Sequence, residues 1–280
     1  TEGGMNAQVL LIAGITAIAL ASVVAGMEAG VKRLSEFNMI LAALLLMFIF
    51  LVGPTSSIFS GFFSNSAAYL ANLLPLSNPV GRTDTNFLQG WTAFYWAWWI
   101  SWSPFVGMFI ARVSRGRSVR EFIICVLIVP TIVCIIWMST FGGAAIEQVI
   151  ADAGAAVGTV SDDLKLFIMA EAYPLTQIVS FVGIVLVVVF FVTSSDSGSL
   201  VIDTITAGGK IDAPVAQRVF WAIFEGLVAI ALLLGGGLGA LQGAAVATGI
   251  PFAIVLLIMM FCTLRGVAEE RRHDKAVQGG

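Results

Sequence analysis

Residues 94–105 read FYWAWWISWSPF, and the four tryptophans among them guide the interpretation of the whole chain. In a helix, residues three and four apart share a face, so four aromatic residues fall on one stripe: Phe94, Trp98, Trp102 and Phe105. Trp99 lies on the flank of that stripe, and Trp91 and Tyr95 lie beside it. Pro104 cannot donate a hydrogen bond to the Ile100 carbonyl. We therefore expect the helix to be interrupted there, with that oxygen free for another partner.

This aromatic stripe has more than one interpretation. Tryptophan and tyrosine gather at the headgroup level of membranes, which explains Trp91 and Tyr95. It explains less well the rings from Trp98 to Phe105, which cover about 10 Å at roughly 1.5 Å per residue. Such deep rings either pack in a core or line a site for a quaternary ammonium ion, which is attracted to π faces. The residues alone leave both possibilities open.

The composition is that of an integral membrane protein. Of the 280 residues, 59% are hydrophobic and 11% are charged, whereas soluble domains carry about 25% charged residues. The net charge of −3 is therefore a poor guide to partners. The cysteines Cys125, Cys134 and Cys262 lie in apolar runs without paired spacing. We expect them to be small buried hydrophobic residues rather than disulfide or metal ligands.

Seven segments are apolar and long enough to span a bilayer, which takes about 20 residues each. We place them near 8–27, 37–53, 91–111, 122–141, 175–194, 218–235 and 243–264. Twelve of the 14 lysines and arginines fall in the loops on one side. Because basic loops stay in the cytoplasm, we expect a cytoplasmic C-terminus and an external N-terminus.

Shorter signals lie between the spans. Gly53-Pro54 should end the second span. Apolar residues at helical spacing in 56–76 predict an amphipathic helix on the outer face. External loops are expected at 74–89 and 142–165, the second one acidic and with one short helix.

A second polar stretch, FFVTSSDSGS at 190–199, lies near the inner end of the fifth span. Serine and aspartate commonly end or cap helices, but hydroxyl oxygens within a membrane also suit a hard cation such as Na⁺. The residues alone favour a helix end. Further on, Thr248 and Gly249-Ile-Pro251 should break the last span mildly. Glu225 is the only carboxylate deep in a late span, and we assign it no role.

The two stretches, together with the arginine-rich run 112–120, resemble the signature regions of the betaine/carnitine/choline transporter family. The resemblance implies an all-α membrane fold of two inverted five-helix repeats of the leucine-transporter type. This chain would hold the last seven of twelve spans, and an external N-terminus without a signal region fits such a fragment. Residues 1–90 would carry the last two helices of the first repeat with an external helix and loop. Residues 91–264 would form the second repeat, and 265–280 a cytoplasmic tail.

The resemblance also implies roles for individual residues. A compact trimethylammonium solute, glycine betaine or choline, would be bound by aromatic side chains: Phe94, Trp96, Trp98, Trp99 and Trp102. A coupling Na⁺ would be bound by Phe190, Thr193 and Ser194, with Phe105 packing toward an ion. The other half of each site would come from helices of the same protein upstream of Thr1. No cofactor other than the ion is expected. The expected partners are the solute, the lipid bilayer and two further copies in a homotrimer, and no nucleic acid.

The expected function is import of the solute across the inner membrane by a cation gradient, in support of osmoprotection. Two alternatives stay open, namely a proton-coupled or exchanging member of the family and a non-transporting subunit or scaffold. Enzymatic activity is not expected. His273 is the only histidine, it lies in the tail, and no nucleophile–base set can be assembled.

Overall fold

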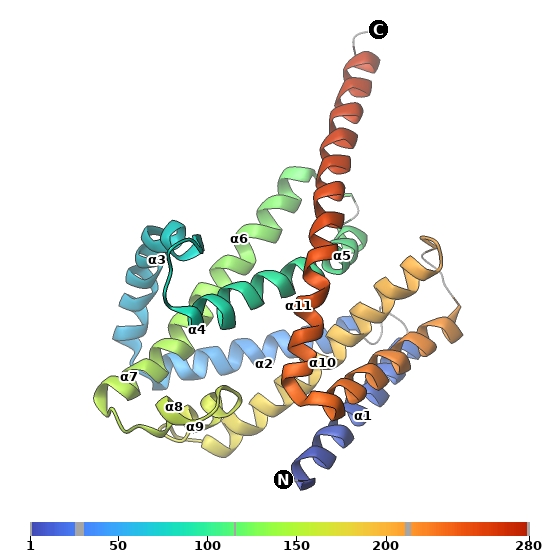
Figure 1. Cartoon of the computed structure of the whole chain (residues 1–280). Coiled ribbons are helices and arrows are strands. Elements are labelled where there is room, and N and C mark those ends of the chain that lie inside the picture. Colours follow the sequence, from blue (N-terminus) through green and yellow to red (C-terminus); the bar gives the residue numbers. More distant parts are fainter. Residues whose placement is uncertain (1, 26–30, 115, 211–213, 279–280) are drawn as a thin grey trace. The chain divides into compact units, whose positions relative to one another are not determined.

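The computed structural model describes residues 2–25, 31–114, 116–210 and 214–278, and these form helices and turns without a strand. Figure 1 follows the helices in chain order. The first part of the chain holds α1 (Glu2–Ala25), α2 (Val31–Val52), α3 (Thr55–Ser77), α4 (Thr85–Phe87), the π-helical turn η1 (Leu88–Ala93) and α5 (Phe94–Val113). The second part holds α6 (Val119–Trp137), the π-helical turn η2 (Met138–Gly142), α7 (Gly143–Ala151), α8 (Ala156–Thr159), the 3₁₀ turn η3 (Asp162–Leu164), α9 (Lys165–Ala170), α10 (Thr176–Thr206) and α11 (Val215–Gln278).

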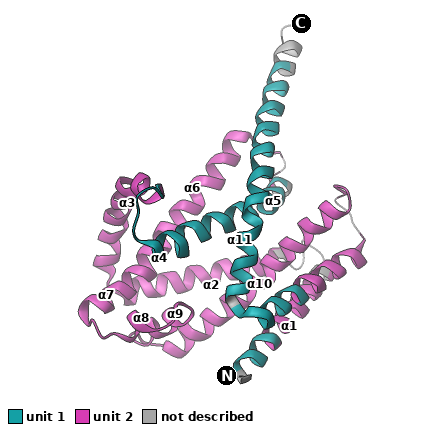
Figure 2. Ribbon diagram, in the orientation of Figure 1, with its two compact units in different colours: residues 1–9, 78–113, 227–280 teal, residues 10–77, 114–226 magenta. Residues whose placement is uncertain are grey.

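The chain divides into two compact units, which Figure 2 colours separately. Unit 1 holds residues 1–9, 78–113 and 227–280, and therefore contains α5 and most of α11. Unit 2 holds residues 10–77 and 114–226, and therefore contains α2, α3, α6 to α10 and the start of α11. Each unit is described by itself below.

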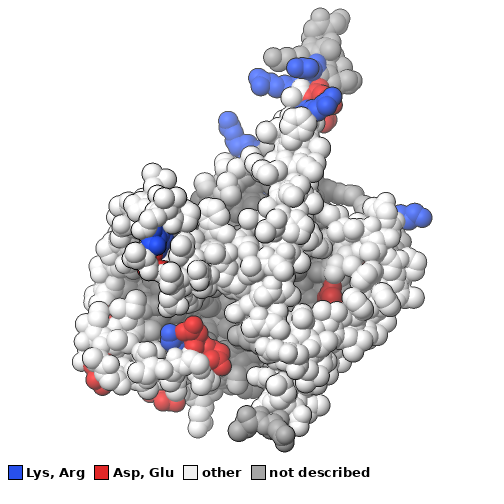
Figure 3. Space-filling view, in the orientation of Figure 1, with Lys and Arg blue, Asp and Glu red and all other residues white. Residues whose placement is uncertain are grey.

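Six helices in the described part of the chain are long and apolar enough to cross a membrane. They are Gly4–Ser22, Lys32–Val52, Val119–Ala151, Thr176–Thr206, Val215–Gly237 and Gly239–Arg272. The face drawn in Figure 3 is correspondingly poor in charged side chains. The chain is thus an all-α, multi-pass membrane protein, as its composition predicts.

The expected span 91–111 is not among these six. Its residues do form the 20-residue helix α5. However, tryptophan, tyrosine and serine carry polar N–H and O–H groups that lower the hydropathy of this helix. Its passage through the membrane therefore stays a prediction, as do the predicted domain boundaries and the cytoplasmic C-terminus.

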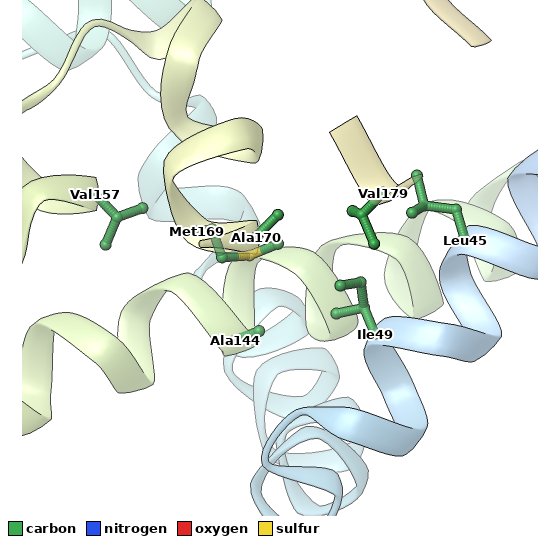
Figure 4. Packing of buried hydrophobic residues seen from close by; sticks show 7 residues of the cluster. All are labelled: Leu45, Ile49, Ala144, Val157, Met169, Ala170 and Val179. Atoms are coloured by element: carbon green, nitrogen blue, oxygen red, sulfur yellow. The ribbon is translucent and has the colours of Figure 1, made fainter. Parts of the chain in front are cut away.

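The buried core of unit 2 forms where α2 and α10 meet the short helices α7 to α9. Its members are apolar residues of small or moderate size: Leu45, Ile49, Ala144, Val157, Met169, Ala170 and Val179. Figure 4 shows these side chains gathered between the helices. The Gln148 side chain donates to the Met169 carbonyl at 3.0 Å and ties α7 to the end of α9.

The prediction of a loop with one short helix at 142–165 is therefore wrong, because this segment is mostly helical. The fourth span continues through η2 into α7, and two further short helices and a 3₁₀ turn follow. Small residues allow this folded-back arrangement, because Ala144 is fully buried and Gly158 lies close to Val149.

Two other expectations about helix boundaries are confirmed and one is wrong. α2 ends at Val52, just before Pro54, and the helix predicted at 56–76 is α3. The break expected around Gly249-Ile-Pro251 is absent from α11, whose non-helical residues are Gly236 and Gly237. Gly237 has φ 64° and ψ −152°, a conformation that only glycine adopts readily.

The prediction that the cysteines are buried is also wrong. Cys125, Cys134 and Cys262 are free and exposed on their helices. In a chain with so many apolar helices, many apolar side chains lie on outward faces, and hydrophobicity alone does not indicate which of them are buried.

Candidate functional site

The aromatic stripe on α5 consists of two stacked ring pairs. The rings of Phe94 and Trp98 stack with centroids 6.1 Å apart, and those of Trp102 and Phe105 stack at 5.8 Å. Tyr95 adds an edge-on contact to Trp98 at 5.6 Å. The helical spacing of the sequence produces these contacts directly, because each stacked pair is three or four residues apart.

The other two predicted cage residues face elsewhere. Trp96 and Trp99 line an open hollow of about 380 Å³ together with Tyr95 and Ile100. Trp99 is 69% exposed and Trp96 60%, whereas Trp98 and Trp102 are 44% and 41% exposed. Unit 1 therefore presents aromatic rings on two sides of α5, a stripe and a hollow.

Pro104 does not interrupt α5, which runs from Phe94 through to Val113. The Ile100 carbonyl, which lacks a partner at Pro104, accepts a hydrogen bond from the Ser103 hydroxyl at 3.0 Å. The expected interruption of the helix is therefore wrong, whereas the Ile100 carbonyl does take another partner, as expected. The serine that precedes the proline supplies the missing hydrogen bond locally.

The second half of α11 packs closely on α5 within unit 1. A Cβ added to Gly249 would come within 3.1 Å of the Ala97 Cβ and 3.3 Å of the Ala97 carbonyl oxygen. Nearby, the rings of Phe252 and Phe105 lie 5.6 Å apart. Gly249 thus allows close helix approach behind the aromatic stripe, a common use of small residues in membrane proteins.

The polar stretch 190–199 does not end its helix, because α10 continues to Thr206. The interpretation of this stretch as a helix end is therefore wrong. Two of its hydroxyl groups bond within the helix instead. The Thr193 hydroxyl lies 3.0 Å from the carbonyls of both Val189 and Phe190, and the Ser197 hydroxyl donates to the Thr193 carbonyl at 2.8 Å. Such bonds to the preceding turn let serine and threonine remain within a helix.

Three of the four residues predicted at the ion sites, Phe190, Thr193 and Ser194, are therefore neighbours on α10. The Phe190 carbonyl and the Thr193 hydroxyl are in contact, and Ser194 follows as a half-buried residue. The fourth, Phe105, belongs to unit 1, whereas α10 belongs to unit 2. Their roles as ligands stay predictions.

The buried polar residues of α10 were not assigned from the sequence. Asp196, Ser199 and Asp203 are at most 1% exposed. Ser195 and Ser199 both donate to Glu225 Oε2, at 3.3 and 3.1 Å. Glu225 therefore connects α11 to α10.

This contact belongs to a longer line of polar side chains, here called the polar seam, that joins α10 to the start of α11. Arg218 forms a salt bridge with buried Asp203 at 3.1 Å. The Thr206 hydroxyl accepts hydrogen bonds from Gln217 at 2.8 Å and from the Trp221 indole at 3.0 Å. The signal in the sequence was the spacing of Ser195, Ser199 and Asp203, four residues apart and hence on one face.

Comparison with known proteins identifies the family to which this membrane protein belongs. The profile of the betaine/carnitine/choline family transporters matches residues 1–272, and the chain belongs to this family. The chain is 64% identical over 272 residues to a glycine betaine/proline/choline transporter of Vibrio parahaemolyticus. The aligned region covers 97% of this chain and 49% of that protein.

Two further relatives are more distant. A glycine betaine transporter of Vibrio parahaemolyticus is 54% identical over 276 residues, 97% of this chain and 53% of that protein. The glycine betaine transporter OpuD of Bacillus subtilis is 40% identical over 275 residues, which are 97% of this chain and 53% of that protein. The chain spans about half the length of the curated relatives it matches. The family comprises transporters and not enzymes, as predicted.

Proposed function

We propose that the protein containing this chain imports glycine betaine or choline into the cell, driven by an inward sodium gradient, in support of osmoprotection. The observation that carries the proposal is the stripe of stacked rings on α5. A trimethylammonium group cannot form a hydrogen bond, so π faces are the side-chain groups best suited to hold it without a carboxylate. The names of the relatives point to the same class of solute.

In this proposal, Phe94, Trp98 and Trp102 contact the ammonium group from one side. Each cation–π contact contributes about 0.5–1 kcal/mol when exposed and about 2 kcal/mol when dry. Several rings and a facing wall are therefore needed for useful affinity. We expect that wall to come from parts of the whole protein beyond this chain. Trp96 and Trp99 would add contacts to the solute from the hollow beside the stripe.

The coupling ion would bind at Phe190, Thr193 and Ser194. The Thr193 hydroxyl donates its hydrogen to a backbone carbonyl of the preceding turn, so its lone pairs remain available to a cation. Carbonyl and hydroxyl oxygens are the ligands that hard cations prefer. Transport itself needs no covalent chemistry, only alternating exposure of the site to the two sides of the membrane.

The test is uptake of labelled glycine betaine and choline by the full-length protein in liposomes. Uptake should require an inward sodium gradient and should not respond to a proton gradient. Thr193→Ala and Ser194→Ala should each raise the sodium concentration for half-maximal uptake by about tenfold, the equivalent of about 1.4 kcal/mol. Thr204→Ala is the matched control, because the Thr204 hydroxyl donates to the Leu200 carbonyl of the same helix, outside the proposed ion site.

Two outcomes would contradict the proposal. If a proton gradient drove uptake in the absence of sodium, the coupling ion would be a proton and not Na⁺. Failure of the wild-type protein to transport either solute would favour the scaffold alternative.

A further inference from the structure

The polar seam of unit 2 contains buried oxygen atoms without hydrogen-bond partners. Asp196 is 0% exposed, and both of its carboxylate oxygens lack a partner. Glu225 Oε1 and the Ser22 hydroxyl of α1 are also buried and unpartnered. The Ser22 hydroxyl lies beside the Asp196 carboxylate, but in a geometry that leaves the oxygens of both groups unpaired. A buried polar atom without a partner is costly, so a group of them needs a physical reason.

These oxygens belong to three helices that meet in this part of unit 2. The Asp196 carboxylate lies within electrostatic range of the Glu225 carboxylate. Ser195 and Ser199 of α10 hold the second oxygen of Glu225. The adjacent Gly226 allows α11 to approach α1, because a Cβ there would lie 2.5 Å from the Thr16 hydroxyl oxygen. The site is therefore built from residues of α1, α10 and the start of α11, and all of these residues lie in unit 2.

Among the described residues, Asp196 and Glu225 form no salt bridge with a basic side chain. Arg218, the basic residue of the seam, pairs with Asp203. On α2, which packs against α10, Lys32 and Arg33 are exposed. Two buried carboxylates thus need a cation, a proton or both from outside the chain.

We propose that Asp196 and Glu225, with the hydroxyls of Ser22, Ser195 and Ser199, bind one small monovalent metal cation of the size and hardness of Na⁺. All of these ligands offer oxygen, which suits a hard cation. In the described chain, groups of three or more carboxylate, histidine or cysteine ligands are absent. A tightly held divalent ion would commonly use such a group, whereas one monovalent cation together with one proton neutralises two carboxylates.

This site is distinct from the ion site proposed at Phe190, Thr193 and Ser194. At about 100° per residue, Ser195 and Ser199 lie roughly 160° and 120° around α10 from Thr193, whereas Asp196 lies roughly 60° from it on the side of α1. The ligands differ, and the second site does not depend on which solute is transported. It can therefore be tested on the purified 280-residue chain without an uptake measurement.

The experiment uses the chain in lipid nanodiscs and N,N′-dicyclohexylcarbodiimide, a hydrophobic reagent that modifies carboxyl groups in apolar surroundings. Mass spectrometry of the peptide containing Glu225 gives the labelling rate. NaCl at ten times its dissociation constant should slow labelling by about tenfold, because a bound cation excludes the reagent in proportion to occupancy. N-methylglucamine chloride at equal ionic strength should leave the rate unchanged.

Variants identify the ligands. Asp196→Asn should raise the sodium concentration for half-protection by about tenfold or more, since a charged ligand is lost. Ser22→Ala removes one neutral oxygen and should raise the sodium concentration for half-protection by a smaller factor. This variant provides the test if Asp196→Asn does not fold. Thr204→Ala is the matched control and should leave the protection of Glu225 unchanged, because its hydroxyl bonds to the Leu200 carbonyl within α10. Thr193→Ala tests whether the protection arises at the other ion site.

Three results would overturn the inference. Labelling that is unaffected by Na⁺, Li⁺ and K⁺ would exclude a metal cation, and labelling that responds to pH alone would assign a proton to the pair. Loss of protection in Thr193→Ala as large as in Asp196→Asn would assign the protection to the other site. Protection of Glu225 in a protein whose full-length form does not transport would contradict the transport proposal only.

Discussion

The aromatic stripe of α5 and the polar seam of α10 differ in how they meet their surroundings. Trp98 and Trp102 are more than 40% exposed in unit 1, whereas Asp196, Ser199 and Asp203 are almost fully buried in unit 2. An aromatic ring can remain exposed to lipid or to a ligand at little cost. A buried carboxylate or hydroxyl requires a partner. The stripe is therefore available to bind a ligand, whereas the seam both holds helices together and contains unsatisfied oxygens.

Replacing a charge in the seam should have the largest effect on stability. Arg218→Leu removes the partner of Asp203, which is 1% exposed and would be left as an uncompensated buried charge. We expect a loss of about 3–5 kcal/mol in the free energy of unfolding, measured by denaturation in detergent micelles. Arg265→Leu is the matched control, because its pair with Glu269 is exposed and should contribute at most about 0.5 kcal/mol. Equal effects of the two variants would show that the seam is not a stabilising feature.

Changing Gly249 of α11, which packs against α5, should have the next largest effect on stability. Gly249→Val adds a branched side chain where even a Cβ would lie 3.1 Å from Ala97. Overpacking of this kind costs about 1–3 kcal/mol and should move α5 away from α11. Thermal unfolding and tryptophan fluorescence would detect the loss and the shift. Gly239→Val is the control, since its Cβ would meet nothing within 4 Å.

Removing a ring of the stripe should affect binding more than stability. Trp98→Leu in the full-length protein should raise the solute concentration for half-maximal uptake by about tenfold, from the loss of about 1–2 kcal/mol of cation–π attraction. Trp91→Leu is the control on the same aromatic segment, because Trp91 lies in the turn η1 before α5. If both variants behaved alike, the stripe would be a packing feature or a membrane belt.

The smallest effect is expected at the partly exposed ion pair before α5. Arg82 donates to Asp84 Oδ1 at 2.8 Å, and this hydrogen bond holds the pKa of the Asp84 carboxyl below its ordinary value of 3.8. A lowered carboxyl pKa stabilises the folded state above the ordinary pKa, and the stabilisation is lost as pH falls through the lowered value. Limited proteolysis of residues 78–87 should therefore accelerate slightly below pH 3.8 in the wild type. Asp84→Asn should abolish that pH dependence, and an unchanged dependence would assign it to another group.

Much of the fold could be predicted because its signals are local. Apolar runs located six membrane helices, Gly53-Pro54 located the end of α2, and 3.6-residue periodicity located the ring contacts Phe94–Trp98 and Trp102–Phe105. Each of these depends on residues within a few turns of one helix. Resemblance of the motifs to one transporter family added the class of protein, which the match over residues 1–272 confirms.

What only the tertiary structure decided depends on contacts between distant segments. Ser195 and Glu225 are 30 residues apart, and their hydrogen bond exists only because α10 and α11 pack in one particular register. The same holds for Gly249 against Ala97, and for Gln148 against Met169. The sequence specified which residues were polar, small or aromatic. Only the packing of helices determined which polar groups found a partner, because helix propensity and periodicity contain no information on the register between helices.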